Sequence, residues 1–206
     1  FDEFRSRSIV NIPITDAAAI KLAYSHSERD GIVENHGNGE DWGIEDRDNL
    51  TADIHLDASD LITLDYKYEN SRIKDTSRLS QILAWTGQIP GIIVFANPAL
   101  RPDGTPVDSG EDRLDEATSY DLIEAGDVEI KAHTFPLVWD LSENLVLKSI
   151  TGHRDVDAYT RNSQTPVTSL TPLYSVTDGI PVTDFEQFTQ EVQLLGDYNQ
   201  WTWVGG

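Results

Sequence analysis

Two adjacent stretches of this chain alternate strictly between apolar and polar side chains, and this period of two constrains the fold more than any other feature. Residues 49–57 place four apolar side chains on one face of a β-strand and four polar ones on the other, respectively Leu50, Ala52, Ile54 and Leu56, and Thr51, Asp53, His55 and Asp57. The alternation resumes in residues 62–69, after a turn at residues 58–60. Together the two stretches predict a β-hairpin with a tight turn and two chemically different faces.

The same pattern recurs on both sides of this hairpin. Further strands are expected at residues 5–14, 17–29, 128–140, 144–159, 185–196 and 200–204, with long connections at residues 30–46, 72–127 and 160–184. Short and long connections then alternate strictly, as in an up-and-down barrel, whereas sandwiches and jelly rolls mix connection lengths. The expected fold is all-β: one domain over residues 1–206, forming an antiparallel up-and-down transmembrane β-barrel segment of about eight strands with long extracellular loops and short periplasmic turns.

The alternation is shared by soluble sheets, so the chemistry of the faces has to separate the two environments. The polar faces carry mixed charges, namely Lys21, Asp53, Asp65, Lys67, Glu69, Lys148 and Glu191. Aromatic residues gather at strand ends, as in the interfacial belt of a membrane protein, and these are Tyr66, Tyr68, Trp139, Trp201 and Trp203. Both features favour a membrane wall, and a soluble antiparallel sheet with one wet face stays open as an alternative.

Composition excludes several functions. The 206 residues hold 15 Lys and Arg against 36 Asp and Glu, a net charge of −21 that argues against a nucleic-acid partner. The absence of Cys removes disulfides, thiolate metal sites and cysteine nucleophiles. Residues 79–100 hold no charged side chain, but Pro90-Gly91 is a turn signal, so this stretch is expected to be an apolar loop. Residues 111–125 have helical spacing of apolar residues and could form a helix within a loop.

Three segments carry a resemblance to a known family. The first is Val10-Asn11-Ile12-Pro13-Ile14-Thr15-Asp16, followed by Ala19-Ile20-Lys21-Leu22-Ala23 and Arg29-Asp30-Gly31-Ile32-Val33-Glu34-Asn35. The second is Leu145-Val146-Leu147-Lys148-Ser149-Ile150-Thr151-Gly152-His153-Arg154-Asp155, and the third is Phe188-Thr189-Gln190-Glu191-Val192-Gln193-Leu194 with Trp201 and Trp203 after a turn. In this order they resemble the barrel of TonB-dependent outer-membrane receptors, with Ile32 where that family more often has an aromatic residue.

The resemblance implies an internal piece of a 22-stranded barrel, with the plug domain and the remaining strands absent. It also implies TonB-dependent uptake of a scarce nutrient such as an iron chelate, cobalamin or a sugar, in the outer membrane of a Gram-negative bacterium. The implied partners are the nutrient, outer-membrane lipid, and the TonB energy-coupling complex, which would bind through the absent N-terminal part. Two other functions stay open: a passive porin-like channel, and a soluble or surface-attached carbohydrate-binding module that stacks sugars on Trp42, Trp85 and Trp139.

Candidate site residues come from the long connections and the polar strand faces. The ligand-binding candidates are Asp41, Trp42, Asp53, His55, Arg72, Lys74, Arg78, Trp85 and Arg101. His55 shares a strand face with two aspartates, which is equally the pattern of a solvated histidine. A Ca²⁺ ion could bind Glu40, Asp41, Glu45, Asp46 and Asp48, or these residues could form a solvated acidic loop. No His-Glu-x-x-His or Gly-x-Ser-x-Gly motif is present, so no enzyme activity, catalytic residue or other cofactor is expected.

Overall fold

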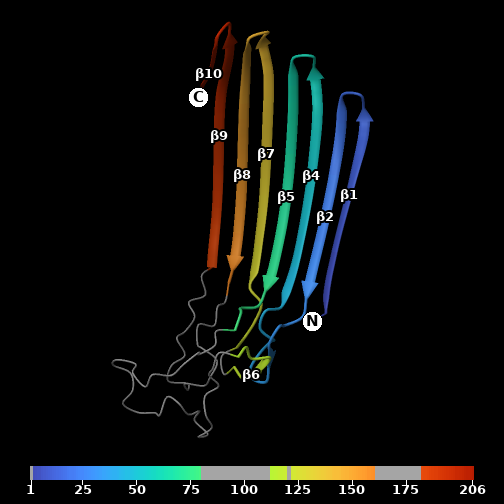
Figure 1. Cartoon of the computed structure of the whole chain (residues 1–206), viewed down its shortest axis with the longest axis vertical. Helices are drawn as coiled ribbons and strands as arrows, with labels where there is room; N and C mark the ends of the chain where they lie inside the picture. Colours follow the sequence, from blue (N-terminus) through green and yellow to red (C-terminus); the bar gives the residue numbers. More distant parts are fainter. Residues whose placement is uncertain (1, 80–111, 120–121, 161–181) are drawn as a thin grey trace, which may run out of the picture.

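A computed structural model of the chain describes residues 2–79, 112–119, 122–160 and 182–206. Seven long strands and one short one, β10, form one antiparallel sheet: β1 (Glu3–Thr15), β2 (Ala18–Arg29), β4 (Glu45–Ser59), β5 (Ile62–Asp75), β7 (Asp127–Ser142), β8 (Leu145–Tyr159), β9 (Val182–Tyr198) and β10 (Trp201–Gly205). Each strand pairs with its neighbours along the chain, as an up-and-down order requires (Figure 1). The predicted antiparallel hairpins are confirmed. The sheet does not close into a barrel, because β1 and β10 lie at opposite edges.

The strands run further than their alternation indicated. The structure places Glu45 and Asp46 in β4 and Arg72 to Asp75 in β5, where the sequence predicted loops. Charged side chains hold these strand ends together: Arg47 pairs with Asp75 across β4 and β5, and Arg29 donates from β2 to Glu45 at 2.7 Å. Because neighbouring strands satisfy the backbone hydrogen bonds of these residues, pairing continues where hydrophobic alternation stops.

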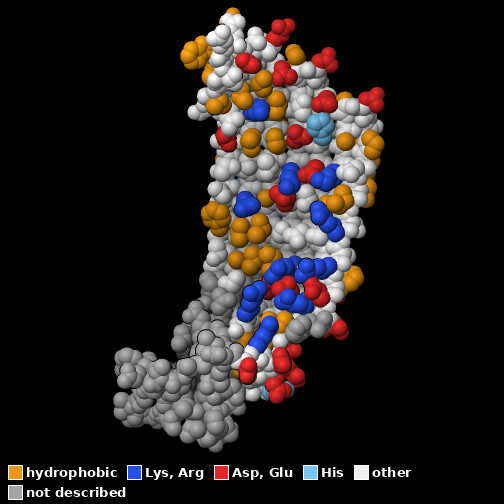
Figure 2. Space-filling model, viewed as in Figure 1, with side chains coloured by type: hydrophobic (Ala, Val, Ile, Leu, Met, Phe, Trp, Pro, Cys, Tyr) orange, Lys and Arg blue, Asp and Glu red, His pale blue; other side chains and the backbone are white. Residues whose placement is uncertain are grey.

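The two sheet faces differ in chemistry, and the register defines them. Ile12, Ile20, Ile54 and Tyr66 are successive partners on β1, β2, β4 and β5, so they lie on one face, here named the band face. Asn11, Lys21, Asp53, Lys67 and Thr134 are successive partners on the opposite face, here named the ion-pair face. Figure 2 shows the ion-pair face, with charged side chains gathered over β2, β4 and β5 and hydrophobic ones over β7 and β8.

Large apolar side chains on the band face are exposed. They form a band beside the short turns, which the half-buried Ile62, Leu64, Tyr66 and Tyr68 of β5 continue: Val10, Ile12, Ile14, Leu22, Tyr24, Leu50, Ile54, Leu56, Phe135, Trp139 and Val192. Further from the turns the same face becomes charged, in one row of successive partners that runs His26, Asp48, Arg72, Glu129, Asp157 and Asp184. The band face is therefore mainly apolar near the turns and mainly charged near the long connections, where Phe4 and Val182 are exposed apolar exceptions.

The four short turns are staggered in one direction across the sheet, as Figure 1 shows by the stepped hairpin tips. Ala18 at the start of β2 pairs with Leu56, and β4 runs on to Ser59. Ile62 at the start of β5 pairs with Trp139, and β7 runs on to Ser142. A stagger in one direction is what tilted strands in a barrel wall require, because their turns then lie near one level.

At the opposite end, two of the long connections pack together into a loop cluster. Its core is Val33, Trp42, Ala117 and Ile123, all buried, with Ile32 and Leu79 packed against it. A short parallel pair, β3 (Glu34–Asn35) with β6 (Glu116–Ala117), joins the connection after β2 to the one after β5. The helix expected at residues 111–125 is wrong for the described part of that range, because those residues hydrogen bond to the other loop and form β6.

Some sequence predictions lie outside the described residues. They are the apolar loop at residues 79–100 beyond Leu79, the candidates Trp85 and Arg101, and most of the connection at residues 160–184. Within the described residues, no helix is long and apolar enough to cross a membrane.

Candidate functional site

A groove on the ion-pair face brings together two of the predicted site residues, Asp53 and His55. It has a volume of about 560 Å³, and its charged lining is Lys21, Asp53, His55, Asp65 and Lys67, with Asn11, Pro13, Thr134 and Pro136 around them. The strands β1, β2, β4, β5 and β7 all contribute, because residues of one register row share a face. The hollowed side of the sheet is thus the charged side.

The charges in this groove satisfy one another. Lys21 Nζ lies 3.2 Å from Asp53 Oδ2, and His55 Nδ1 lies 2.7 Å from Asp65 Oδ1. Lys67 Nζ lies 2.7 Å from Glu69 Oε1 on the same strand. Since each cation has a carboxylate partner, the groove has no spare charge that would select an ion.

Asp41 and Trp42 lie inside the loop cluster. The Trp42 side chain is 2% exposed and packs against Val33 and Ile123, so in this conformation its ring faces no solvent on which a sugar could stack. Asp41 accepts a hydrogen bond from the backbone N–H of Asn35 at 2.8 Å, which holds the turn that Trp42 closes. In this structure both residues stabilise the loop. They were ligand-binding candidates only because they lie in a long polar connection.

The basic residues among the ligand-binding candidates separate in the structure. Arg72 lies on the band face, where its Nε donates to Asp127 Oδ1 at 3.0 Å, and Lys74 lies on the same face one step further along β5. Arg78 follows the end of β5 and lines a different hollow, described below. Arg72 and Lys74 therefore lie on one face of β5, whereas Arg78 lies beyond the end of the strand and lines another surface.

The five carboxylates proposed for Ca²⁺ do not converge. Glu45 lies on the ion-pair face and pairs with Arg29, whereas Asp46 and Asp48 lie on the band face. Asp41 belongs to the loop cluster. Period two places successive strand residues on opposite faces, so Glu45 and Asp46 cannot share one ion.

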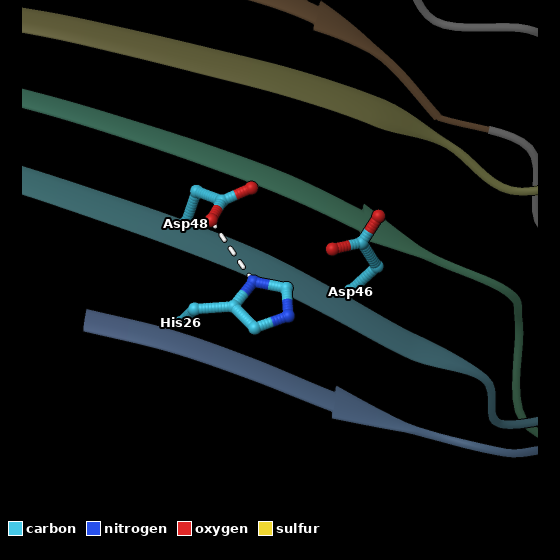
Figure 3. A group of neighbouring side chains, drawn as sticks. All are labelled: His26, Asp46 and Asp48. Atoms are coloured by element: carbon cyan, nitrogen blue, oxygen red, sulfur yellow. Dashed lines mark hydrogen bonds and ion pairs between the residues drawn. The ribbon is translucent and has the colours of Figure 1, made fainter. Parts of the chain in front are cut away.

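Among the residues that the structure describes, three histidine and carboxylate groups have donor atoms close enough to hold a metal ion: His26 with Asp46 and Asp48, His36 with Glu34 and Glu116, and His153 with Asp155 and Glu186. Figure 3 shows the first, in which His26 Nδ1 lies 2.9 Å from Asp48 Oδ1 and Asp46 projects from the same strand as Asp48. The Tyr24 hydroxyl also donates to Asp48. All three groups lie at the surface, and each histidine already has a carboxylate partner.

His36 joins the two loops of the cluster by a side-chain contact. Its Nε2 lies 3.1 Å from Glu116 Oε2, and this hydrogen bond is the largest reason that the pKa of His36 is raised above its usual value. Coulombic attraction to Glu34 and Glu116 adds to the effect, while desolvation opposes it. Protonation of His36 therefore strengthens its contact with Glu116, which joins the loop that contains β3 to the loop that contains β6.

A second hollow lies at the long-connection end and was not expected from the sequence. It has a volume of about 590 Å³ and is lined by Glu3, Arg29, Ile32, Val33, Arg78, Leu79, Arg113 and Leu114. We name it the arginine cleft. The sequence drew attention to Arg78 alone, because Arg29 belongs to a strand and Arg113 was assigned to a helix. Only the packing of the loop cluster brings the three together.

Comparison with known proteins adds no relative. No protein-family model matches the chain, and no curated protein and no solved structure matches it either.

Proposed function

We propose that this sheet is part of the wall of an outer-membrane β-barrel, and that the barrel is a TonB-dependent receptor for uptake of a scarce nutrient. The observation that carries the membrane part is the exposed apolar band on the face opposite the ion pairs. Val10 is 52% exposed and Ile54 44%, while Lys21, Asp53 and Lys67 lie on the other face. A soluble barrel would need the reverse, with apolar side chains in the hollow.

The cost of leaving this band in water supports lipid as its surroundings. Apolar surface in water costs about 25 cal/mol per Å², and soluble monomers rarely expose contiguous apolar patches above a few hundred Å². The band continues across β1, β2, β4, β5 and β7, where most of its members are large aliphatic or aromatic side chains. Lipid tails would cover it without further protein.

The height of the band fits a bilayer. Measured from the short turns, it ends seven residues from Leu61 at Tyr68 on β5 and ten residues from Asp60 at Leu50 on β4. With about 3.3 Å per residue and a tilt of ~40°, these lengths correspond to roughly 18–25 Å. Outer-membrane barrels have an outward apolar band about 25 Å tall.

The charged row beyond the band supports one orientation of the proposed wall. Residues of this row would stand outside the hydrocarbon, with the long connections beyond them, and long connections face the cell exterior in such barrels. The short turns would then face the periplasm. The open edges at β1 and β10 would pair with further barrel strands, because lipid does not tolerate an unpaired strand edge.

The receptor part of the proposal rests on the three sequence segments that resemble the family. In the structure they occupy the β1 and β2 hairpin at one edge of the sheet, and β8 with the adjoining β9 and β10 hairpin at the other. A porin-like channel would share the wall and lack the coupling to TonB.

Fractionation and electrophoresis test the wall directly. We expect the protein to extract with the detergent-soluble outer-membrane fraction and to change its electrophoretic mobility on heating. Recovery in low-salt buffer without detergent, with no change on heating, would contradict the membrane proposal. Crosslinking to TonB in energised cells tests the receptor part, and a passive channel would show none.

A further inference from the structure

We propose that the arginine cleft binds a small anion, carrying a carboxylate or phosphate group together with an apolar part. This proposal names the ligand class of the receptor proposed above, and it rests on that function. Its lining combines the guanidinium groups of Arg29, Arg78 and Arg113 with the apolar side chains of Ile32, Val33, Leu79 and Leu114. Pockets of 300–1,000 Å³ with apolar walls and few polar groups are typical of small-molecule sites.

The charge of the cleft is opposite to that of the chain. The lining holds three arginines and one acid, Glu3, so its formal charge is +2 in a protein of net charge −21. Glu3 is paired with Arg5 outside the cleft, and Arg29 is paired with Glu45. Positive charge concentrated in a concave site raises the local concentration of anions.

Two of the arginines have spare donors. Among the residues that the structure describes, no hydrogen bond or ion pair engages the guanidinium of Arg78 or Arg113. A guanidinium presents five N–H groups in a planar fork that matches carboxylate and phosphate oxygens, so two such groups beside one hollow can hold a single anion from two sides.

Arg29 provides an independent indication. Its Nη2 donates to Gly43 O at 3.0 Å and to Glu45 at 2.7 Å, but its Nε is buried and has no acceptor. It is the one such buried side-chain atom found in the described residues. A buried donor without a partner is unfavourable by about 1–3 kcal/mol, and a bound anion would remove this cost only if the Arg29 side chain turned to present its Nε to the cleft.

The surroundings of Arg29 limit where the anion can bind. The neighbouring hollow shares Arg29 and Glu3 with the arginine cleft, and its further acidic lining is Asp2, Glu28, Asp30, Glu45 and Asp46. Their charges exclude an anion there. The arginine cleft, bounded by the loop cluster, is therefore the side of Arg29 on which an anion is stabilised.

Phenyl phosphate, which joins a phosphate group to an apolar ring, is the probe, and isothermal titration of the whole protein in non-ionic detergent or in buffer measures its binding. We expect saturable binding that weakens about tenfold or more in R78Q/R113Q. The matched control is R7Q/R154Q, which removes two exposed arginines away from the cleft and changes net charge equally. We expect that control to bind within about twofold of the native protein.

Three results would overturn the proposal: no saturable binding of phenyl phosphate, an equal loss in both double variants, or equally tight binding of phenol. R78K/R113K keeps the charge and should retain more affinity than R78Q/R113Q, which distinguishes a lost contact from an unfolded loop. Binding requires the folded cleft and no membrane. Loss of binding with normal membrane insertion would overturn the cleft alone, and binding by a protein that stays soluble would overturn the membrane wall alone.

Discussion

Replacing Ile54 by arginine separates the membrane wall from a water-exposed sheet. Ile54 lies on the band face of β4 and is 44% exposed. It stands six residues before Asp60 at the turn, which places it about 15 Å from the level of the turns, near the middle of the band. An arginine at the bilayer midplane of a barrel costs about 2–4 kcal/mol, whereas the same change at a water-exposed position usually lies within ±0.5 kcal/mol.

The matched control is T51R on the same strand. Thr51 lies on the ion-pair face, opposite Glu69 on β5, so an arginine there gains an acidic neighbour. We expect T51R to change the free energy of unfolding by less than about 0.5 kcal/mol. Substitution to arginine should therefore lower the free energy of unfolding on the band face of β4 and leave it nearly unchanged on the ion-pair face.

The assay is urea unfolding of the protein in phospholipid vesicles, followed by tryptophan fluorescence. The midpoint and slope give the free energy of unfolding for native protein, I54R and T51R under identical conditions. An I54R protein as stable as the native one would show that the band face meets water. A T51R protein as destabilised as I54R would show that both faces are buried, as in a sandwich.

Three further predictions concern the loop cluster. W42A should open the cluster and leave the sheet intact, because loss of a buried tryptophan costs about 3–5 kcal/mol. Amide exchange at Val33 should accelerate in W42A, and W201A, which truncates an exposed tryptophan, is the control that should leave this exchange unchanged. G37A would push a methyl group into the carbonyl oxygen of Ser119 and should destabilise the cluster by about 1–3 kcal/mol in the same assay, with G205A, which meets nothing closer than 3.9 Å, unchanged. The His36 contribution to stability should be complete below its ordinary pKa of ~6.5 and lost as pH rises through its raised pKa; an NMR titration should show that raised pKa and its fall in E116Q, and an unchanged value would contradict the link.

The strands could be predicted because apolar and polar residues alternate with a period of two wherever the two faces of a strand meet different surroundings. Residues 49–57 and 62–69 alternate without error, and the structure pairs them residue by residue in β4 and β5. Glu45 to Asp48 and Arg72 to Asp75 have no apolar alternation, since both faces are polar at that end of the sheet. The sequence therefore showed where the strands are two-faced and missed how far they run.

The loop cluster could not be predicted from local pattern. Trp42 reads as an exposed aromatic in an acidic loop, and its burial depends on Ala117 and Ile123, which lie about eighty residues away in sequence. The same packing brings Arg29 and Arg113 together with Arg78. The helical spacing of residues 111–125 was misleading because tertiary contacts with the first loop outweigh a weak local preference.

Nitroxide scanning of β4 tests the membrane wall most directly, and the absence of native cysteine makes single-cysteine labelling simple. Labels at residues 50 to 57 would be read by electron paramagnetic resonance in vesicles, with oxygen as the lipid-soluble relaxant and a nickel chelate as the water-soluble one. We expect oxygen accessibility to peak at Leu50, Ala52, Ile54 and Leu56, and nickel accessibility to peak at the alternate positions. Equal access of the nickel chelate to both sets would contradict a lipid-facing band.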